Sequence, residues 1–259
     1  MTNHDSNESY DVTDQMGGGS PQPQKTREPV FNIPAVIIGL IGLCGVIYVA
    51  QNYLISEEHN FIFMLNFAFI PARFTYGTGF YDPAALFTML SYSFMHGSFA
   101  HLAVNMVWLA AFGSPLAGRI GTSKILIFWA LTSIVAVLTH YAIYPTSNIP
   151  LVGASGAISG MMGAAARYGF RRVPTHSGNK NMSAFAGPLL PVLTTLTYRP
   201  VITFVGIWFI INIITGVYSA QEAGLASIAW EAHIGGFVAG FFGIALLDRP
   251  KEYDRYFKR

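Results

Sequence analysis

The chain has 259 residues, of which 52% are hydrophobic and only 11% are charged, well below the roughly 25% charged residues of an ordinary soluble domain. A formal net charge of +2 gives no reason to expect a nucleic-acid partner, and one cysteine, Cys44, excludes a disulfide framework or a cysteine-based metal site. Long apolar runs instead indicate a polytopic membrane protein with a single membrane domain and polar tails.

The first hundred residues combine a polar tail, one apolar run and a long mixed segment. Residues 1–29 are rich in glycine, proline and polar residues, which predicts a disordered tail. The apolar run 30–53 is long enough to cross a bilayer. Residues 54–98 are aromatic but lack such a run, and Asp82-Pro83 is a typical helix start. We interpret 54–98 as a long interfacial loop with short helices.

The remaining chain holds four apolar segments that are long enough to span and one that is short. The long segments cover about 99–116, 125–144, 201–219 and 228–247. The short one runs from Ala154 to Arg167, which is about 20 Å of helix against a hydrocarbon core of roughly 30 Å. The loop 145–153 is therefore expected to dip into the membrane, with Ser155 below its surface. Together these segments predict an all-α protein with six membrane helices.

Lysine and arginine residues gather on one side of the predicted membrane. All of them except Arg73 lie before the first span, between spans two and three, in or beside the loop between four and five, or after the sixth. Because cytoplasmic loops carry the excess of these residues, both termini are expected in the cytoplasm. The chain then divides into a disordered tail (1–29), a membrane domain (30–247) and a short basic tail (248–259).

Four polar residues converge on one layer near the outer face of this topology. Spans two, four and six run in the same direction, so residues near their N-terminal ends share one depth. His101 and Asn105 begin span two, Ser155 begins span four, and His233 lies near the start of span six. Polar groups are costly in lipid and usually functional there.

Small residues provide the means to bring two of these spans together. They are Gly156, Gly160 and Ala164 on span four and Gly236 and Gly240 on span six. Such stripes allow close helix contact in membranes, and that contact would place His233 against Ser155. Histidine is the usual base that activates a serine near neutral pH. The N–H groups at the start of span four, Asn105 and His101 are candidate oxyanion donors.

Three segments together resemble the signature motifs of the rhomboid family of intramembrane serine proteases. They are 96–105 (HGSFAHLAVN), 153–156 (GASG) and 232–240 (AHIGGFVAG), in the order of the family and on its second, fourth and sixth helices. The resemblance covers about residues 30–247. It implies a six-helix rhomboid-like bundle in which Ser155 is the nucleophile, His233 the general base, and His101 and Asn105 the oxyanion partners.

The resemblance also implies the substrates and the chemistry. Rhomboid proteases cleave transmembrane helices or adjacent segments without a metal or cofactor, so single-span or polytopic membrane proteins and membrane lipids are the expected partners. We expect a multi-pass protein of a bacterial cytoplasmic membrane. Two alternatives are a non-catalytic rhomboid-like scaffold, which usually lacks the serine or the histidine, and a small-solute transporter, which would place polar groups at the midplane of two repeated halves.

The base has no obvious carboxylate partner in the sequence. Glu231 lies two positions before His233, which on a helix turns its side chain by about 200°, away from the imidazole or toward the outer surface. Ser159 stands where some rhomboid proteases carry an aromatic residue that packs on the base. A Ser155–His233 dyad is therefore expected, with the imidazole held by packing or by Asn or Ser side chains. His96 and His140 are expected to be interfacial or structural.

Overall fold

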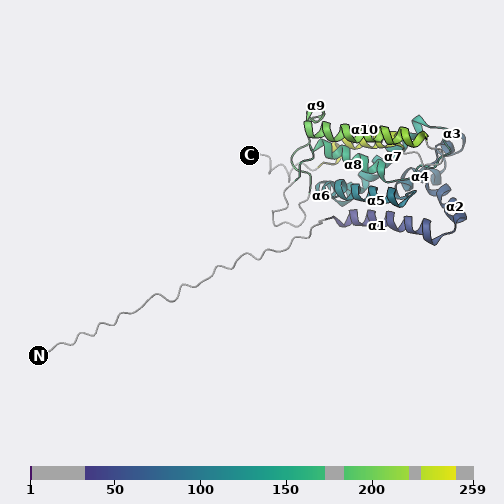
Figure 1. The fold of residues 1–259 in the computed structure, drawn as a ribbon, viewed down its shortest axis with the longest axis horizontal. Coiled ribbons are helices and arrows are strands. Elements are labelled where there is room, and N and C mark those ends of the chain that lie inside the picture. The colour runs from purple at the N-terminus through teal and green to yellow at the C-terminus, as the bar shows by residue number, and fades with distance from the viewer. Residues whose placement is uncertain (2–32, 173–183, 222–228, 249–259) are drawn as a thin grey trace. The chain divides into compact units, whose positions relative to one another are not determined.

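A computed structural model describes residues 1, 33–172, 184–221 and 229–248 of the chain. Apart from Met1 and Asp248, the predicted tails 1–29 and 248–259 lie outside these residues. The described residues form helices and two isolated β-bridges but no strand. In chain order the helices (Figure 1) are α1 (Ala35–Val49), η1 (Ala50–Leu54), α2 (Glu57–Phe67), α3 (Ala72–Tyr76), α4 (Pro83–Ser91), η2 (Tyr92–Phe94), α5 (Phe99–Trp108), η3 (Leu109–Gly113), α6 (Ser114–Ile120), α7 (Thr122–Ile143), α8 (Ser155–Arg167), α9 (Val192–Thr197), α10 (Arg199–Gln221) and α11 (Trp230–Leu247).

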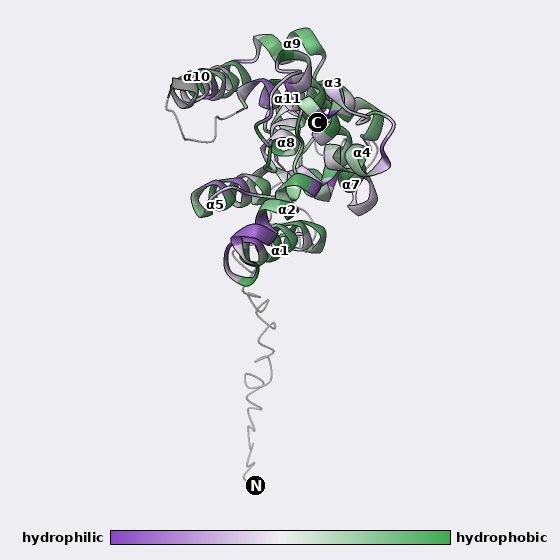
Figure 2. Cartoon of the chain, turned by 90° about the vertical axis from the view of Figure 1, so that its right-hand side faces the viewer, coloured by the Kyte–Doolittle hydropathy of each residue, from purple (hydrophilic) through white to green (hydrophobic). Residues whose placement is uncertain are grey.

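Five helical segments of the described chain are long and apolar enough to cross a membrane. They are Ala35–Leu54, Phe99–Ile120, Thr122–Ile143, Arg199–Gly216 and Trp230–Leu247, and hydrophobic residues dominate most of the helices in Figure 2. These segments correspond to five of the six predicted spans. The second one contains a π-helical turn at Leu109–Gly113 and then continues to Ile120, four residues past the predicted end at 116.

The predicted short fourth segment is α8, which has 13 residues and begins at Ser155. Every residue of α8 after Ser155 is buried, which distinguishes it from the longer helices, since more than half of each candidate span is not buried. A helix of this length is shorter than the five candidate spans. The all-helical membrane fold is thus confirmed, whereas the count of six spanning helices stays a prediction.

Two pairs of glycines bring α8 and α11 into backbone contact. A Cβ atom added at Gly236 would overlap the carbonyl oxygen of Gly156, and one added at Gly240 would overlap that of Gly160. Gly163 lies against the carbonyl oxygen of Phe237 in the same way. The predicted close contact between these two helices through small residues is therefore confirmed.

The segment between η1 and α5 contains the short helices that were predicted for it. The Asp82 carboxylate accepts a hydrogen bond from the Ala84 N–H at 2.9 Å, and Pro83 occupies the first turn of α4. Phe69 and Leu151 exchange two backbone hydrogen bonds, so this segment supports the residues that lead into α8. Its location in the membrane interface stays a prediction.

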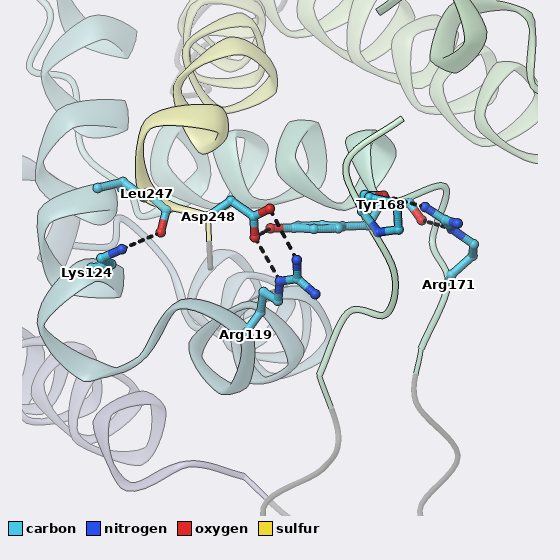
Figure 3. Close-up of polar contacts among 7 residues, drawn as sticks. Arg119, Lys124, Tyr168, Arg171, Leu247 and Asp248 are labelled. Atoms are coloured by element: carbon cyan, nitrogen blue, oxygen red, sulfur yellow. Dashed lines mark hydrogen bonds and ion pairs between the residues drawn. The ribbon is translucent and has the colours of Figure 1, made fainter. Parts of the chain in front are cut away.

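A buried polar cluster fixes the C-terminal end of α11 (Figure 3). Arg119 forms an ion pair with Asp248 at 2.8 Å, and the Tyr168 hydroxyl donates to the same carboxylate at 2.8 Å. Lys124 donates to the carbonyl oxygen of Leu247 at 2.7 Å. The end of α11 is thereby attached to α6, α7 and the residue that follows α8.

Candidate active site

Ser155 is held at the first position of α8 by the loop before it. Gly153 has φ of +129°, a conformation that residues with a side chain rarely adopt, and its N–H donates to the carbonyl oxygen of Tyr92 at 3.0 Å. Ala154 and Gly156 are buried on either side, while Ser155 is half-buried. The first N–H groups of an α-helix lack partners within the helix and favour negative charge at its N-terminus, where Ser155 lies.

His233 faces this serine from the second turn of α11. The distance from His233 Nε2 to Ser155 Oγ is 2.8 Å, which is a hydrogen bond between the two side chains. The glycine contacts that follow along the two helices, Gly156 with Gly236 and Gly160 with Gly240, make this approach possible, because no side chain separates the backbones. The structure thus brings together the two residues that the sequence selected as nucleophile and base.

A third side chain, Asn212 of α10, contacts the other ring nitrogen of His233. Asn212 Oδ1 lies 2.5 Å from His233 Nδ1, and the asparagine is only 7% exposed. Sequence reasoning proposed that Asn or Ser contacts hold the imidazole but did not name this residue. One signal was present, because Asn212 is a polar residue in the apolar run of span five, where such residues are rare and usually functional.

His101 reaches the same site from the first turn of α5. A Cβ atom at Gly153 would lie 2.9 Å from His101 Nε2 and 3.6 Å from Ser155 Oγ, so the absence of a side chain at Gly153 allows His101 to approach the serine. The His101 ring also meets the edge of the His96 ring, with centroids 5.1 Å apart. Among the described residues, no direct hydrogen bond joins His101 to Ser155.

Asn105 and His96 bring further hydrogen-bonding groups to this region. Asn105 is 4% exposed, and its amide Nδ2 has no hydrogen-bond partner among the described residues. His96 is 3% exposed and both of its ring nitrogens lack such a partner. Burial, together with the neighbouring His101, lowers the pKa of His96 to about 4. His96 is therefore neutral at physiological pH, with one N–H donor and one acceptor nitrogen.

Glu231 points away from His233, as its helical position predicted. Its Oε1 lies 2.5 Å from Nδ1 of His140 on α7, and Glu231 as a whole is only 2% exposed. The alternative expectation, that Glu231 extends to the outer surface, is wrong, because a partner on α7 is within reach. His140 has the structural environment that was expected for it.

Apolar helices of membrane-spanning length, with a serine–histidine hydrogen bond between two helices of the bundle, are typical of an integral membrane protein with a candidate catalytic serine. Comparison with known sequences identifies the family. The family model described as the Rhomboid domain matches residues 83–249. The chain therefore belongs to the rhomboid family and is an integral, multi-pass membrane protein.

Three curated relatives match similar shares of the chain. It is 30% identical over 151 residues to "Rhomboid protease GlpG" of Yersinia pseudotuberculosis, covering 58% of this chain and 44% of the relative. It is 26% identical over 164 residues to "RHOMBOID-like protein 5" of Arabidopsis thaliana (63% and 45%) and 28% identical over 163 residues to "RHOMBOID-like protein 4" of the same plant (62% and 34%). The chain thus spans less than half the length of these relatives.

Proposed function

We propose that this protein is an intramembrane serine endopeptidase that cleaves transmembrane segments of other membrane proteins through a Ser155–His233 dyad. The observation that carries the proposal is the 2.8 Å hydrogen bond between Ser155 Oγ and His233 Nε2. Membership of the rhomboid family and a relative named as a rhomboid protease support the reaction class. A scaffold that only binds its clients has no need for this contact.

The proposed reaction proceeds in two stages. His233 Nε2 accepts the hydroxyl proton while Ser155 Oγ forms a bond to the carbonyl carbon of the scissile peptide. The resulting imidazolium then donates this proton to the leaving amine, the C–N bond breaks, and an acyl-serine remains. Water deprotonated by the same imidazole attacks the ester, and the serine is released with the carboxylate product. These steps require no metal or cofactor.

The tetrahedral intermediate carries a negative oxygen that needs hydrogen-bond donors. The N–H groups at the start of α8 and the Asn105 Nδ2 group are the proposed donors, with His101 as a further partner. The buried Nδ2 without a partner supports this role for Asn105, since an unsatisfied buried donor is costly in a resting protein. A substrate oxygen would satisfy it.

The location of the site follows the proposed topology of six membrane helices with both termini in the cytoplasm. In that topology Ser155 and His233 lie near the outer face of a bacterial cytoplasmic membrane, at the end of the short helix α8. Single-span or polytopic membrane proteins are the proposed substrates, and lipids surround the bundle. A small-solute transporter remains the alternative that predicts no covalent chemistry at Ser155.

Labelling with a serine-directed fluorophosphonate tests the proposal without knowledge of the substrate. We expect the purified protein in detergent to be labelled on Ser155, and Ser155→Ala and His233→Ala to abolish both labelling and cleavage of a single-span membrane substrate. Unchanged thermal unfolding would show that the variants are folded. Equal labelling of the wild type and Ser155→Ala would refute the assignment of the nucleophile.

A further inference from the structure

The orientation of the Asn212 amide is determined by its two contacts. Its Nδ2 donates to the Trp208 carbonyl oxygen at 2.7 Å, and a carbonyl oxygen can only accept. The amide oxygen must therefore face His233. That oxygen can only accept as well, so the proton of the imidazole lies on Nδ1, and Nε2 is left free to accept the proton of Ser155.

Asn212 is the central member of a short line of contacts between α10 and α11. One turn before it, the Trp208 ring stacks on Phe237 with centroids 5.2 Å apart. One turn after it, a Cβ at Gly216 would lie 2.5 Å from the ring of Trp230. The positions 208, 212 and 216 are four residues apart and share one face of α10. This face meets α11 in antiparallel register, with Asn212 opposite His233.

The other faces of α10 contrast with this line. The large apolar side chains beside Asn212, such as Ile210, Ile211 and Ile214, are more than half exposed, as expected of a helix that faces lipid. An asparagine amide on such a helix is costly unless it is paired. Among the described residues, its single partner outside α10 is the candidate base.

We propose that Asn212 is a positioning residue for catalysis, and that it holds His233 in the tautomer and ring orientation required to accept the proton of Ser155. This inference rests on the proposed protease function. It makes the catalytic unit a Ser–His–Asn arrangement in which an uncharged amide takes the place that a carboxylate has in soluble serine proteases. The third member is supplied by α10, so a movement of α10 relative to α11 changes the orientation of the base.

Among the described side chains around His233, Asn212 is the one positioned to hold the imidazole through Nδ1. Ser159, one turn after the nucleophile, is small, so no aromatic ring from that position holds the imidazole. Of the ionisable groups on the packed helices, Glu231 is paired with His140 of α7, and His101 lies across the serine on α5. Asn212 is the residue in the described chain that hydrogen-bonds to Nδ1.

The rate of fluorophosphonate labelling of Ser155, measured from about pH 5 to 9, tests this role because it reports activation of the serine directly. Asn212→Leu removes the acceptor at similar volume, and we expect the maximal labelling rate to fall by about tenfold or more, since general-base catalysis contributes at least that much. The probe concentration that gives half of the maximal labelling rate should change little. Asn212→Asp keeps an acceptor in place, so labelling should persist.

The pH profile separates positioning from a purely structural role. A carboxylate at position 212 stabilises the protonated imidazole, and protonated His233 cannot act as the base. The acidic limb of the labelling rate should therefore move to higher pH in Asn212→Asp. Thr215→Val is the matched control, because Thr215 lies on the same helix and its hydroxyl bonds, within the described part of the chain, only to backbone carbonyls of α10.

Each outcome decides between the alternatives. An unshifted acidic limb in Asn212→Asp, or an unchanged labelling rate in a folded Asn212→Leu, overturns the role of Asn212. If Asn212→Leu does not fold, the pH profile of Asn212→Asp decides alone. Absence of Ser155-dependent labelling in the wild-type protein would instead count against the protease function itself.

Discussion

Gly240 of α11 lies so close to Gly160 of α8 that a Cβ atom at Gly240 would overlap the Gly160 carbonyl oxygen. Gly240→Ala should therefore push the two helices apart, at a cost of about 1–3 kcal/mol for overpacking. The same displacement would lengthen the contact between His233 and Ser155, so activity should fall as well. Gly243→Ala is the matched control, because a Cβ there meets nothing within 4 Å. Thermal unfolding in detergent and fluorophosphonate labelling are the measurements, and equal behaviour of both variants would contradict the prediction.

A second prediction concerns the oxyanion site. Asn105→Ala should lower kcat by up to roughly a hundredfold, because it removes one of several donors to the developing charge. KM should change much less, since the donor acts mainly on the transition state. Asn52→Ala is a suitable control, because the exposed Asn52 amide of η1 bonds, among the described residues, only to the Tyr48 carbonyl oxygen of α1. We expect His101→Ala to resemble Asn105→Ala, and an effect confined to KM would argue against the role.

The orientation in the membrane gives a third prediction. Cys44 is buried, so a Cys44→Ala protein provides a background without a native thiol. In this background, an impermeant maleimide applied to intact cells should label Ser147→Cys, in the loop before α8. Ser177→Cys, in a segment outside the described residues, should be labelled only after the membrane is opened. The reverse pattern would invert the proposed topology and move the site to the cytoplasmic side.

The ion pair between Arg119 and Asp248 leads to a fourth prediction. Both side chains are almost completely buried, and breaking a buried pair by removing one partner is strongly destabilising. Asp248→Ala should thus lower the free energy of unfolding by roughly 3–5 kcal/mol. The double variant Arg119→Met/Asp248→Leu should recover much of this loss, as measured by unfolding in detergent. A double variant as unstable as Asp248→Ala would show that the packing around the pair, and not its charge, determines stability.

The sequence predicted those features that depend on local patterns. Asp82-Pro83 begins a helix because its carboxylate and ring suit the first turn, and the small residues of α8 and α11 meet because glycines permit it. Contacts that depend on the rotation of one helix against another were not predicted. Asn212 reaches His233, and His140 reaches Glu231, only because of how α10 and α7 are turned toward α11. Hydrophobic periodicity gave no help there, because the long helices are apolar on nearly every face.

The contact between Glu231 and His140 supports the last prediction, which asks whether a carboxylate orients the base. Glu231 is the acidic residue nearest to His233 in the sequence, yet its carboxylate is paired with His140 on α7. Glu231→Gln keeps an oxygen that accepts a hydrogen bond from His140, so cleavage and labelling should be largely retained. Glu231→Leu would leave His140 buried without a partner, which should cost about 1–3 kcal/mol of stability.

The two variants together distinguish support of the fold from support of the reaction. If the Glu231–His140 pair acts only by attaching α11 to α7, a variant should lose activity only as far as it loses stability. Glu231→Gln should then be close to the wild type in both properties. Neutralising the aspartate of a soluble serine protease triad lowers kcat by roughly ten-thousandfold. A loss of that size in a stable Glu231→Gln protein would show that Glu231 orients His233, and that the base is held from α7 instead of from Asn212.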